Sequence, residues 1–247
     1  MIRLTKVIEP QYLTLRGAQW LADLNKAIIL HGGYDAIPEK EKDRLISHYR
    51  HDNIKNALFP TSFNKCAFCE CIPDEGGNFI QVEHFYPKSL YPMHCFSWDN
   101  FLPCCGRCNL SKSDLDTITQ PIINPYVDDP CEHLHVSLLK IKGNPGSVMG
   151  ENSVRELKLN NSRLIIARRN LLGEIENLTE RVAEVMTEIQ DSQTPRIRNN
   201  KIGKLLDLID ELEALMHPSH TYSFFCKQII LSEEEYRQAK LVLLSAS

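Results

Sequence analysis

The first sixty residues carry apolar side chains at helical spacing. In residues 9–31 and again in residues 38–59, the apolar positions fall on one side of a helix of 3.6 residues per turn. Gly32 and Gly33 follow the first run and predict its end, because glycine adopts the left-handed conformation that terminates many helices. We expect two helices that form an N-terminal brace over residues 1–60. Their apolar positions are Leu13, Leu21, Leu24 and Ile28, then Leu45, Tyr49, Ile54 and Leu58.

The periodicity disappears between residues 61 and 120. Cysteines, prolines, glycines and aromatic residues alternate there in short runs, which is typical of a small metal-held module with little regular structure. In residues 121–152, Pro and Gly bracket a strand-like stretch at 133–141. We therefore expect a small metal-held module at 61–120, followed by a loop-rich bridge at 121–152.

The C-terminal region, residues 153–247, is predicted to be helical. Its apolar residues alternate in spacings of three and four, the pattern of a coiled-coil seam, on both sides of a break at Pro195. Two antiparallel helices that form a helical hairpin are the simplest arrangement. Ser232 and Glu235 suggest a capping box that opens a last short helix. The seam positions are Leu171, Ile175, Leu178, Val182, Val185 and Ile189, answered by Ile202, Leu205, Ile209, Leu212 and Met216.

The resulting fold class is α+β and mostly helical. The small metal-held module is expected between the N-terminal helices and the C-terminal hairpin. The last helix, with Tyr236, Leu241 and Leu244, lies near a chain end, where an ordered segment normally packs against something. We expect the C-terminal region to dock a partner, although two amphipathic helices usually bury their seams against each other.

Composition indicates the cellular compartment and whether the cysteines bind metal or form disulfides. No segment approaches the roughly 18 apolar residues that a membrane span needs, so a cytoplasmic location without membrane contact is the default expectation. The nine cysteines are odd in number and several lie in C-x-x-C pairs, which favours metal binding over disulfides.

Two of these pairs define a predicted metal centre. Cys66 and Cys69 form one pair, and Cys105 and Cys108 form the other. Four thiolates on two such turns can complete the tetrahedral shell of a structural zinc ion. The spacing leaves open whether Cys71, Cys95 or Cys104 contributes.

Three short runs between and around these pairs resemble HNH endonucleases. They are VEHFYPKS at 82–89, WDNFLPCC at 98–105 and CGRCNLSK at 105–112. In the resemblance, His84, Asn100 and Asn109 take the places of the three residues that name the family. The resemblance implies a zinc-stapled ββα-metal module, in which two strands are followed by a helix. A divalent ion is held between the first strand and that helix.

The chemistry of phosphodiester hydrolysis suits these residue types. His84 is the predicted general base, and Asn100 is predicted to orient it by bonding backbone across the loop. Glu83 and Asn109 offer hard oxygen ligands suited to a catalytic Mg²⁺ or Mn²⁺ ion. Many HNH sites carry Asp or His at the place of Glu83. Lys112 and Arg107 are predicted phosphate contacts.

A wider resemblance covers most of the chain up to about residue 170. The stretches at 2–13, 66–70, 123–136 and 157–172 are similar to the HNH nuclease subunits of the Septu anti-phage system, the PtuB family, and to their counterparts encoded beside some retrons. This resemblance implies a bacterial defence effector that cuts DNA together with PtuA, an ABC-type ATPase.

The charge distribution bears on how DNA would be gripped. The whole chain has a formal charge of −4, and residues 61–120 carry four basic against seven acidic side chains. DNA affinity arises mostly from phosphate neutralisation, so we expect this acidic module to bind DNA weakly unless another component supplies positive charge. A stand-alone restriction or homing-type HNH nuclease would need a basic recognition segment, and none is evident. A non-catalytic zinc-ribbon interaction module is the second alternative. The charged residues are Lys65, Lys88, Arg107 and Lys112 against Glu70, Asp74, Glu75, Glu83, Asp99, Asp114 and Asp116.

Overall fold

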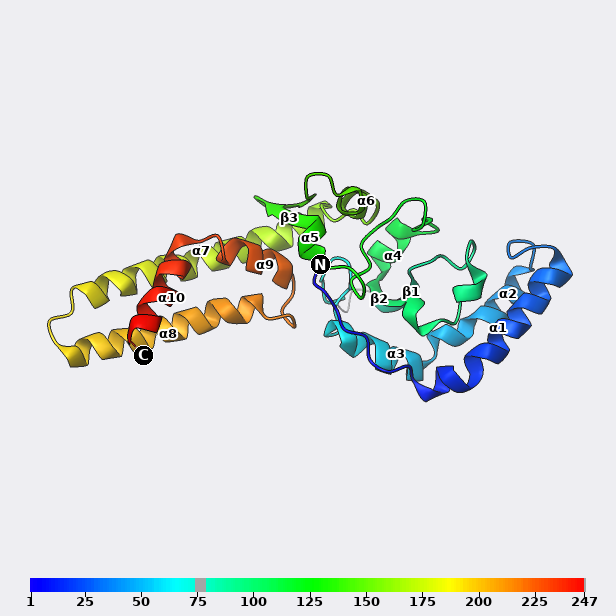
Figure 1. Ribbon diagram of the computed structural model, residues 1–247, viewed down its shortest axis with the longest axis horizontal. Coiled ribbons are helices and arrows are strands. Elements are labelled where there is room, and N and C mark those ends of the chain that lie inside the picture. Colours follow the sequence, from blue (N-terminus) through cyan, green and yellow to red (C-terminus); the bar gives the residue numbers. More distant parts are fainter. Residues whose placement is uncertain (74–78, 247) are drawn as a thin grey trace. The chain divides into compact units, whose positions relative to one another are not determined.

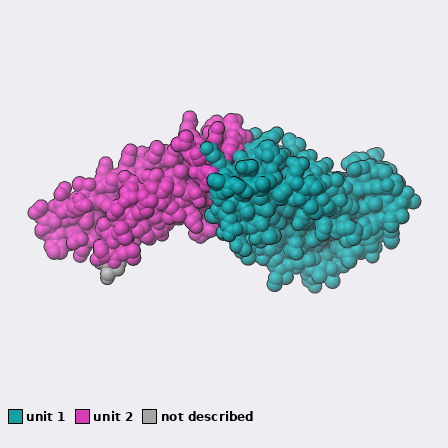
Figure 2. All heavy atoms as spheres, turned by 45° about the horizontal axis from the view of Figure 1, so that its top comes forward, with its two compact units in different colours: residues 1–134, 142–159 teal, residues 135–141, 160–247 magenta. Residues whose placement is uncertain are grey.

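The computed structural model describes residues 1–73 and 79–246 (Figure 1). The chain forms two compact units, coloured separately in Figure 2. Unit 1 comprises Met1–Leu134 and Lys142–Leu159, and unit 2 comprises His135–Ile141 and Asn160–Ser247. The predicted brace, the metal module and most of the predicted bridge thus share unit 1. Asp74 and Glu75, counted above among the acidic residues, lie outside the described residues.

The N-terminal brace contains more breaks than the sequence predicts. Helix α1 spans Gln11–His31 and ends at Gly32, whose φ of 79° is left-handed as expected. The prediction of a single helix over residues 38–59 is wrong. The chain forms α2 (Glu39–Ile46), the 3₁₀ turn η1 (Ser47–Arg50) and α3 (Asp52–Leu58) instead.

The break before α3 has a local cause. His51 is extended, with ψ of 142°, and its side chain accepts a hydrogen bond from the backbone N–H of Asn53. This side chain therefore caps α3, and a cap residue cannot also continue the preceding helix. Another 3₁₀ turn, η2 (Phe59–Ser62), leads into the first cysteine pair.

The metal module has the predicted ββα order. Strand β1 (Ile80–His84) pairs antiparallel with β2 (Phe101–Cys105), and helix α4 (Gly106–Lys112) follows directly. The register sets His84 opposite Phe101 and Ile80 opposite Cys105. The loop between the strands contains the short turns η3 (Pro92–His94) and η4 (Trp98–Asn100). The mostly helical α+β class with a small ββα module is confirmed.

The brace and the module share one hydrophobic core. Leu24 of α1 and Ile54 of α3 are buried in the same cluster as Val82 of β1 and Phe101 of β2. Trp98 also donates its indole N–H to the carbonyl of Val7 at 2.8 Å. The N-terminal segments are therefore part of the fold of the module, and they position its first strand.

The bridge is more ordered than a loop. It contains α5 (Pro130–His133), β3 (Leu134–Ser137), β4 (Lys140–Gly143) and α6 (Val148–Glu156). The strand-like stretch predicted at 133–141 is a two-stranded hairpin, and Leu138 takes a left-handed φ of 55° at its turn.

Unit 2 contains the predicted helical hairpin. Helices α7 (Ser162–Gln190) and α8 (Pro195–Met216) bury the predicted seam in a shared cluster, and Pro195 is the first residue of α8. Two further helices follow, α9 (Ser223–Ile230), which the sequence did not reveal, and α10 (Glu234–Ala246).

The last helix packs onto the same hairpin. Tyr236 and Ala239 of α10 are buried in the cluster that α7 and α8 form. The predicted capping box is wrong, because α10 begins at Glu234 and its N-cap is therefore Glu233 instead of Ser232, whose hydroxyl donates to the carbonyl of Ile229. Among the described residues, no helix combines the length and the apolar character that crossing a bilayer requires.

Candidate metal centre and active site

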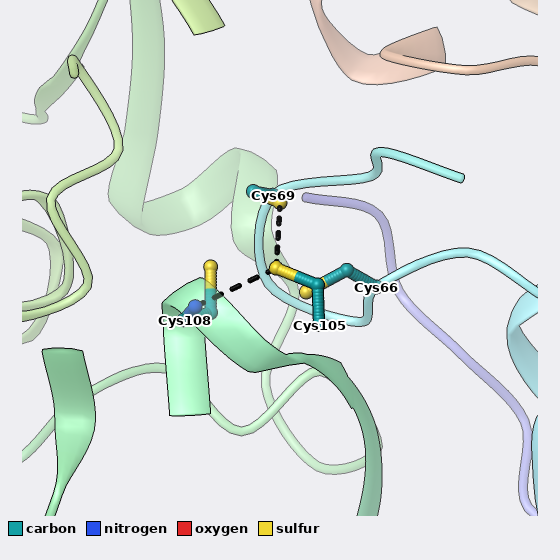
Figure 3. A group of neighbouring side chains, drawn as sticks. All are labelled: Cys66, Cys69, Cys105 and Cys108. Carbon is teal, nitrogen blue, oxygen red and sulfur yellow. Dashed lines mark hydrogen bonds between the residues drawn. The ribbon is translucent and has the colours of Figure 1, made fainter. Parts of the chain in front are cut away.

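Four cysteine side chains converge at the junction of η2, β2 and α4. The sulfur atoms of Cys66, Cys69, Cys105 and Cys108 all lie within 4.8 Å of one another, and all four residues are buried. Figure 3 shows the first pair facing the second across a small gap, with Cys69 Sγ 3.8 Å from Cys105 Sγ. Tetrahedral zinc with bonds of about 2.3 Å sets its sulfurs about 3.8 Å apart. The donor set and its spacing therefore fit a structural zinc ion.

Backbone hydrogen bonds shape both turns. The N–H of Cys66 donates to the carbonyl of Cys71 at 2.9 Å, and the N–H of Ala67 reaches the Pro103 carbonyl of β2 at 2.8 Å. In the second turn, the N–H of Cys108 points at Cys105 Sγ, 3.5 Å away (Figure 3). N–H groups aimed at sulfur stabilise the thiolate that a metal needs. The fold thus presents the two pairs toward each other.

The cysteines whose contribution the sequence left open lie beside the cluster or away from it. Cys71 Sγ is 3.4 Å from Cys69 Sγ, and Cys104 Sγ is 4.0 Å from Cys66 Sγ, yet neither belongs to the group of four. Cys95 is buried in the hydrophobic core, where burial raises the pKa of its thiol to about 12. It stays protonated and apolar at neutral pH.

His84 ends β1 in a buried position. Its Nε2 lies 2.8 Å from the carbonyl oxygen of Cys95, and because a carbonyl only accepts, Nε2 carries the proton. The Tyr49 and Phe101 rings meet the imidazole edge-on, with centroids at 4.6 and 5.2 Å. Burial, aided by the nearby Lys88 ammonium, lowers the pKa of His84 well below its usual value. The ring is therefore neutral at neutral pH, with Nδ1 left as a proton acceptor.

Asn100 bonds the loop between the two strands. Its side-chain oxygen accepts from the N–H of Tyr86 at 2.7 Å, and its amide group donates to the carbonyls of Tyr86 and His94 at 3.0 Å each. These bonds hold Tyr86, two residues after His84, and His94, the residue before Cys95. Asn100 thus touches both segments that fix the imidazole.

Glu83 and Lys112 form a buried ion pair between β1 and α4. Lys112 Nζ lies 2.9 Å from Glu83 Oε1 and 2.8 Å from the carbonyl oxygen of His84. Burial raises the pKa of the Glu83 carboxyl, and the Lys112 charge opposes that rise. The sequence predicted Lys112 as a phosphate contact, but its side chain is fully buried. The other predicted phosphate contact, Arg107, is exposed on α4.

Asn109 faces β1 from the helix. Its amide donates to Gln81 Oε1 at 2.7 Å, so α4 covers the strand face that carries Gln81 and Glu83. Carboxylate and amide oxygens are the donors that Mg²⁺ and Mn²⁺ use, and Mg²⁺ commonly takes one or two protein ligands with waters and phosphate completing the shell. Glu83 on β1 offers a carboxylate oxygen of this kind, and Asn109 on α4 offers an amide oxygen.

Sequence reasoning missed Gln81 and Tyr49. Gln81 lies two residues before Glu83, so strand alternation would have placed both on one face. Tyr49 was recognised only as an apolar helix position, and nothing in its local sequence shows that it contacts His84.

The chain is similar to known Septu proteins. No family model matches the chain. A Septu protein PtuB from Bacillus thuringiensis is 33% identical over 199 residues, which cover 78% of this chain and 74% of that protein. A Septu protein PtuB from Bacillus mycoides (strain KBAB4) is 24% identical over 222 residues, covering 73% and 74% respectively. At this identity and coverage, the chain belongs to the PtuB family of the Septu anti-phage defence system.

Proposed function

We propose that the chain is a metal-dependent HNH endonuclease that hydrolyses DNA phosphodiester bonds. One observation carries the proposal: a neutral imidazole, His84, is anchored through Nε2 at the end of β1, and the preceding residue, Glu83, contacts the helix α4, which also carries Asn109. Hydrolysis of a phosphodiester needs a base for water and a cation for the developing charge, and these three side chains offer both functions within one ββα unit.

His84 acts as the general base in this mechanism. Because Nε2 donates to the Cys95 carbonyl, Nδ1 is the atom that takes the proton from the attacking water. The same hydrogen bond stabilises the imidazolium that forms, since the carbonyl accepts from a charged donor at that moment. A divalent ion bound by Glu83 and Asn109 would supply Lewis-acid stabilisation of the phosphate oxygens.

Asn100 and Lys112 act as positioning residues. Asn100 holds Tyr86 and His94, so it fixes the segments on both sides of the imidazole. Lys112 donates to the carbonyl of His84 and to Glu83, so it fixes the strand end and compensates the buried carboxylate. The zinc at the four cysteines would hold β2 and α4 to the turn after η2, which is a structural role.

We further propose that the chain acts with PtuA, the ABC-type ATPase of the family resemblance. The formal charge of −4 predicts weak DNA affinity for the chain alone. A partner that binds both DNA and the nuclease raises the local concentration of the substrate at the active site.

The decisive experiment is nicking of supercoiled plasmid DNA in Mg²⁺ by the chain co-expressed with the ATPase. We expect His84→Ala to slow nicking by about 10²–10⁴-fold, the usual contribution of a general base. His84→Gln, which fills more of the buried space, separates loss of the base from loss of packing. The matched control is His94→Ala, in the loop that follows β1, because the His94 side chain is exposed.

All three variants are first checked for zinc content and melting temperature. Nicking at the wild-type rate by a folded His84→Gln protein would remove the general base from the mechanism. Absence of magnesium-dependent nicking by the wild-type complex would favour the non-catalytic interaction module.

A further inference from the structure

A pocket of about 400 Å³ opens beside β1, next to the proposed active site. Its walls come from two parts of unit 1 that are far apart in the sequence. Tyr49, Arg50 and Lys55 belong to η1 and α3 of the brace, whereas Gln81 and Asn109 belong to the metal module. The brace therefore contributes side chains directly to the surroundings of Asn109.

The charge of this pocket is opposite to that of the module. Its described lining includes two cations, Arg50 and Lys55, and no carboxylate. The module itself is acidic, with four basic and seven acidic side chains in residues 61–120. Positive charge beside the site is thus supplied by residues that precede the HNH motif, which motif-based reasoning would not include.

Tyr49 links one of these cations, Arg50, to the proposed general base. The Arg50 guanidinium and the Lys88 ammonium each lie 5.3 Å from the centroid of the Tyr49 ring. The same ring meets the His84 imidazole edge-on at 4.6 Å. Arg50 and Lys88 therefore lie near an aromatic ring that contacts His84, and Asn109 lines the same pocket as Tyr49 and Arg50.

The cations of the pocket have partners that a phosphate can replace. Arg50 pairs with Asp43 at 3.0 Å and Lys55 with Asp52 at 3.3 Å, and both ion pairs are solvent-exposed. Exposed ion pairs contribute little and exchange readily. Lys112 differs, because it is fully buried against Glu83. Arg50 also offers the planar fork that binds a phosphate through two parallel hydrogen bonds.

From this geometry we propose that Arg50 and Lys55, which line the pocket together with Tyr49, bind the backbone phosphates of the DNA strand that enters the HNH site. The proposal rests on the nuclease function proposed above and names the side chains that bring its substrate to Asn109 and His84. It assigns the phosphate contacts to residues of the brace instead of to Lys112.

The test measures DNA binding without cleavage. A fluorescein-labelled DNA duplex and the matching single strand are titrated with the full zinc-loaded His84→Gln chain, at several salt concentrations, and followed by fluorescence anisotropy. Arg50→Ala, Lys55→Ala and the double variant are compared in that background. Lys40→Ala is the matched control, because Lys40 is exposed on α2 and does not line the pocket.

We expect the double variant to bind about tenfold more weakly at low salt. Its plot of log affinity against log salt should be shallower by about 1.4–1.8, since each phosphate contact contributes about 0.7 for single strands and 0.9 for duplex. The difference between the two slopes shows which form of DNA occupies the pocket. Arg50→Lys should recover part of the affinity, because it keeps the charge and loses the fork.

Zinc content and melting temperature are measured for every variant. A double variant with the affinity and salt slope of Lys40→Ala would overturn the proposal, as would absence of DNA binding by the full chain at low salt. The outcome is independent of His84 catalysis. A failed nicking experiment would remove the reaction and leave the phosphate site standing, whereas unchanged binding would remove the site and leave the reaction.

Discussion

Lys112 Nζ lies 2.9 Å from Glu83 Oε1 in a part of unit 1 where the side chains are 0% and 9% exposed. The two residues are 29 positions apart, and the contact forms because α4 packs across the β1–β2 pair. A charge that is withdrawn from water is destabilising unless an opposite charge is buried beside it. Each of them therefore depends on the other, and the pair joins the helix to the strand that carries His84.

This pairing predicts an unequal response to removing lysine charges. Lys112→Met leaves the Glu83 carboxylate buried without its counter-charge, and breaking a buried pair typically costs about 3–5 kcal/mol. Lys26→Met is the matched control, because Lys26 forms an exposed pair with Asp23 and its loss should change stability little. The measurement is the free energy of unfolding by urea for the zinc-loaded protein. Equal losses in the two variants would contradict the buried role of Lys112.

The metal centre predicts different outcomes for two neighbouring cysteines. Cys69 belongs to the group of four, whereas Cys71, two residues later, lies beside it. Cys69→Ala should lose the zinc ion and destabilise unit 1 on the order of 10 kcal/mol, the scale of structural zinc binding. Cys71→Ala should keep one zinc per chain. Metal analysis by mass spectrometry, combined with thermal melting, checks both. Zinc loss from both variants, or from neither, would redefine the ligand set.

The sequence predicted the parts of this fold that depend on local spacing. Paired C-x-x-C turns and a hairpin seam interrupted by Pro195 follow from residues close together in the chain, whereas the ββα order was implied by the resemblance to HNH endonucleases. Such patterns carry their own geometry, because a two-residue gap fixes a turn and a three-four alternation fixes a helix face.

Other features were not predictable because they depend on tertiary contacts or on competing local bonds. From the sequence, Lys112 is expected to be a surface charge, but α4 packs on β1 and buries it against Glu83. Tyr49 is expected only to be a core position of a helix, but in the structure its ring contacts His84. The break at His51 comes from a side-chain cap that is weak as a sequence signal. Helical periodicity alone cannot detect such a competitor.

A pH-dependent contribution to stability is expected from Lys6. Its ammonium donates to the Phe101 carbonyl at 2.6 Å and lies 4.3 Å from the centroid of the Tyr126 ring. Burial, opposed by the charge of Asp99, lowers the pKa of Lys6 from 10.5 to about 7. Between these values the unfolded chain binds more protons than the folded one. The stability contributed by a neutral Lys6 is therefore fully present above pH 10.5 and is lost as the pH falls toward 7.

The measurement compares urea unfolding of the wild type and Lys6→Met at two pH values, about 7.5 and about 9.5. The advantage of the wild type over the variant should grow with pH, at about 1.4 kcal/mol per unit at most. Lys40→Met, at an exposed position, should show no such growth. A constant difference between wild type and Lys6→Met would mean that Lys6 keeps an ordinary pKa in the folded chain.

The last helix offers a test of partner docking. Tyr236 and Ala239 are buried against α7 and α8, so truncation after Leu231 would remove part of the core of unit 2 and test folding instead of binding. Leu241 and Leu244 lie one turn apart on α10 and are 59% and 72% exposed. We propose that this pair contacts the ATPase, since an amphipathic helix can bind a partner groove through apolar anchors three or four residues apart. Replacing both with Ser should abolish co-purification with the ATPase and leave the melting temperature nearly unchanged.

The matched control for this pair is Leu206→Ser, which alters a leucine of α8 that is 49% exposed. Because Leu206 lies on another helix of the same unit, it should keep the partner if docking depends on α10. Zinc content reports on unit 1 and should be the same in all variants, since the four cysteines lie outside unit 2. If the Leu241→Ser/Leu244→Ser protein still co-purified normally, the partner surface would lie elsewhere, and the exposed apolar residues Leu15 and Ile29 of α1 would be the next to substitute.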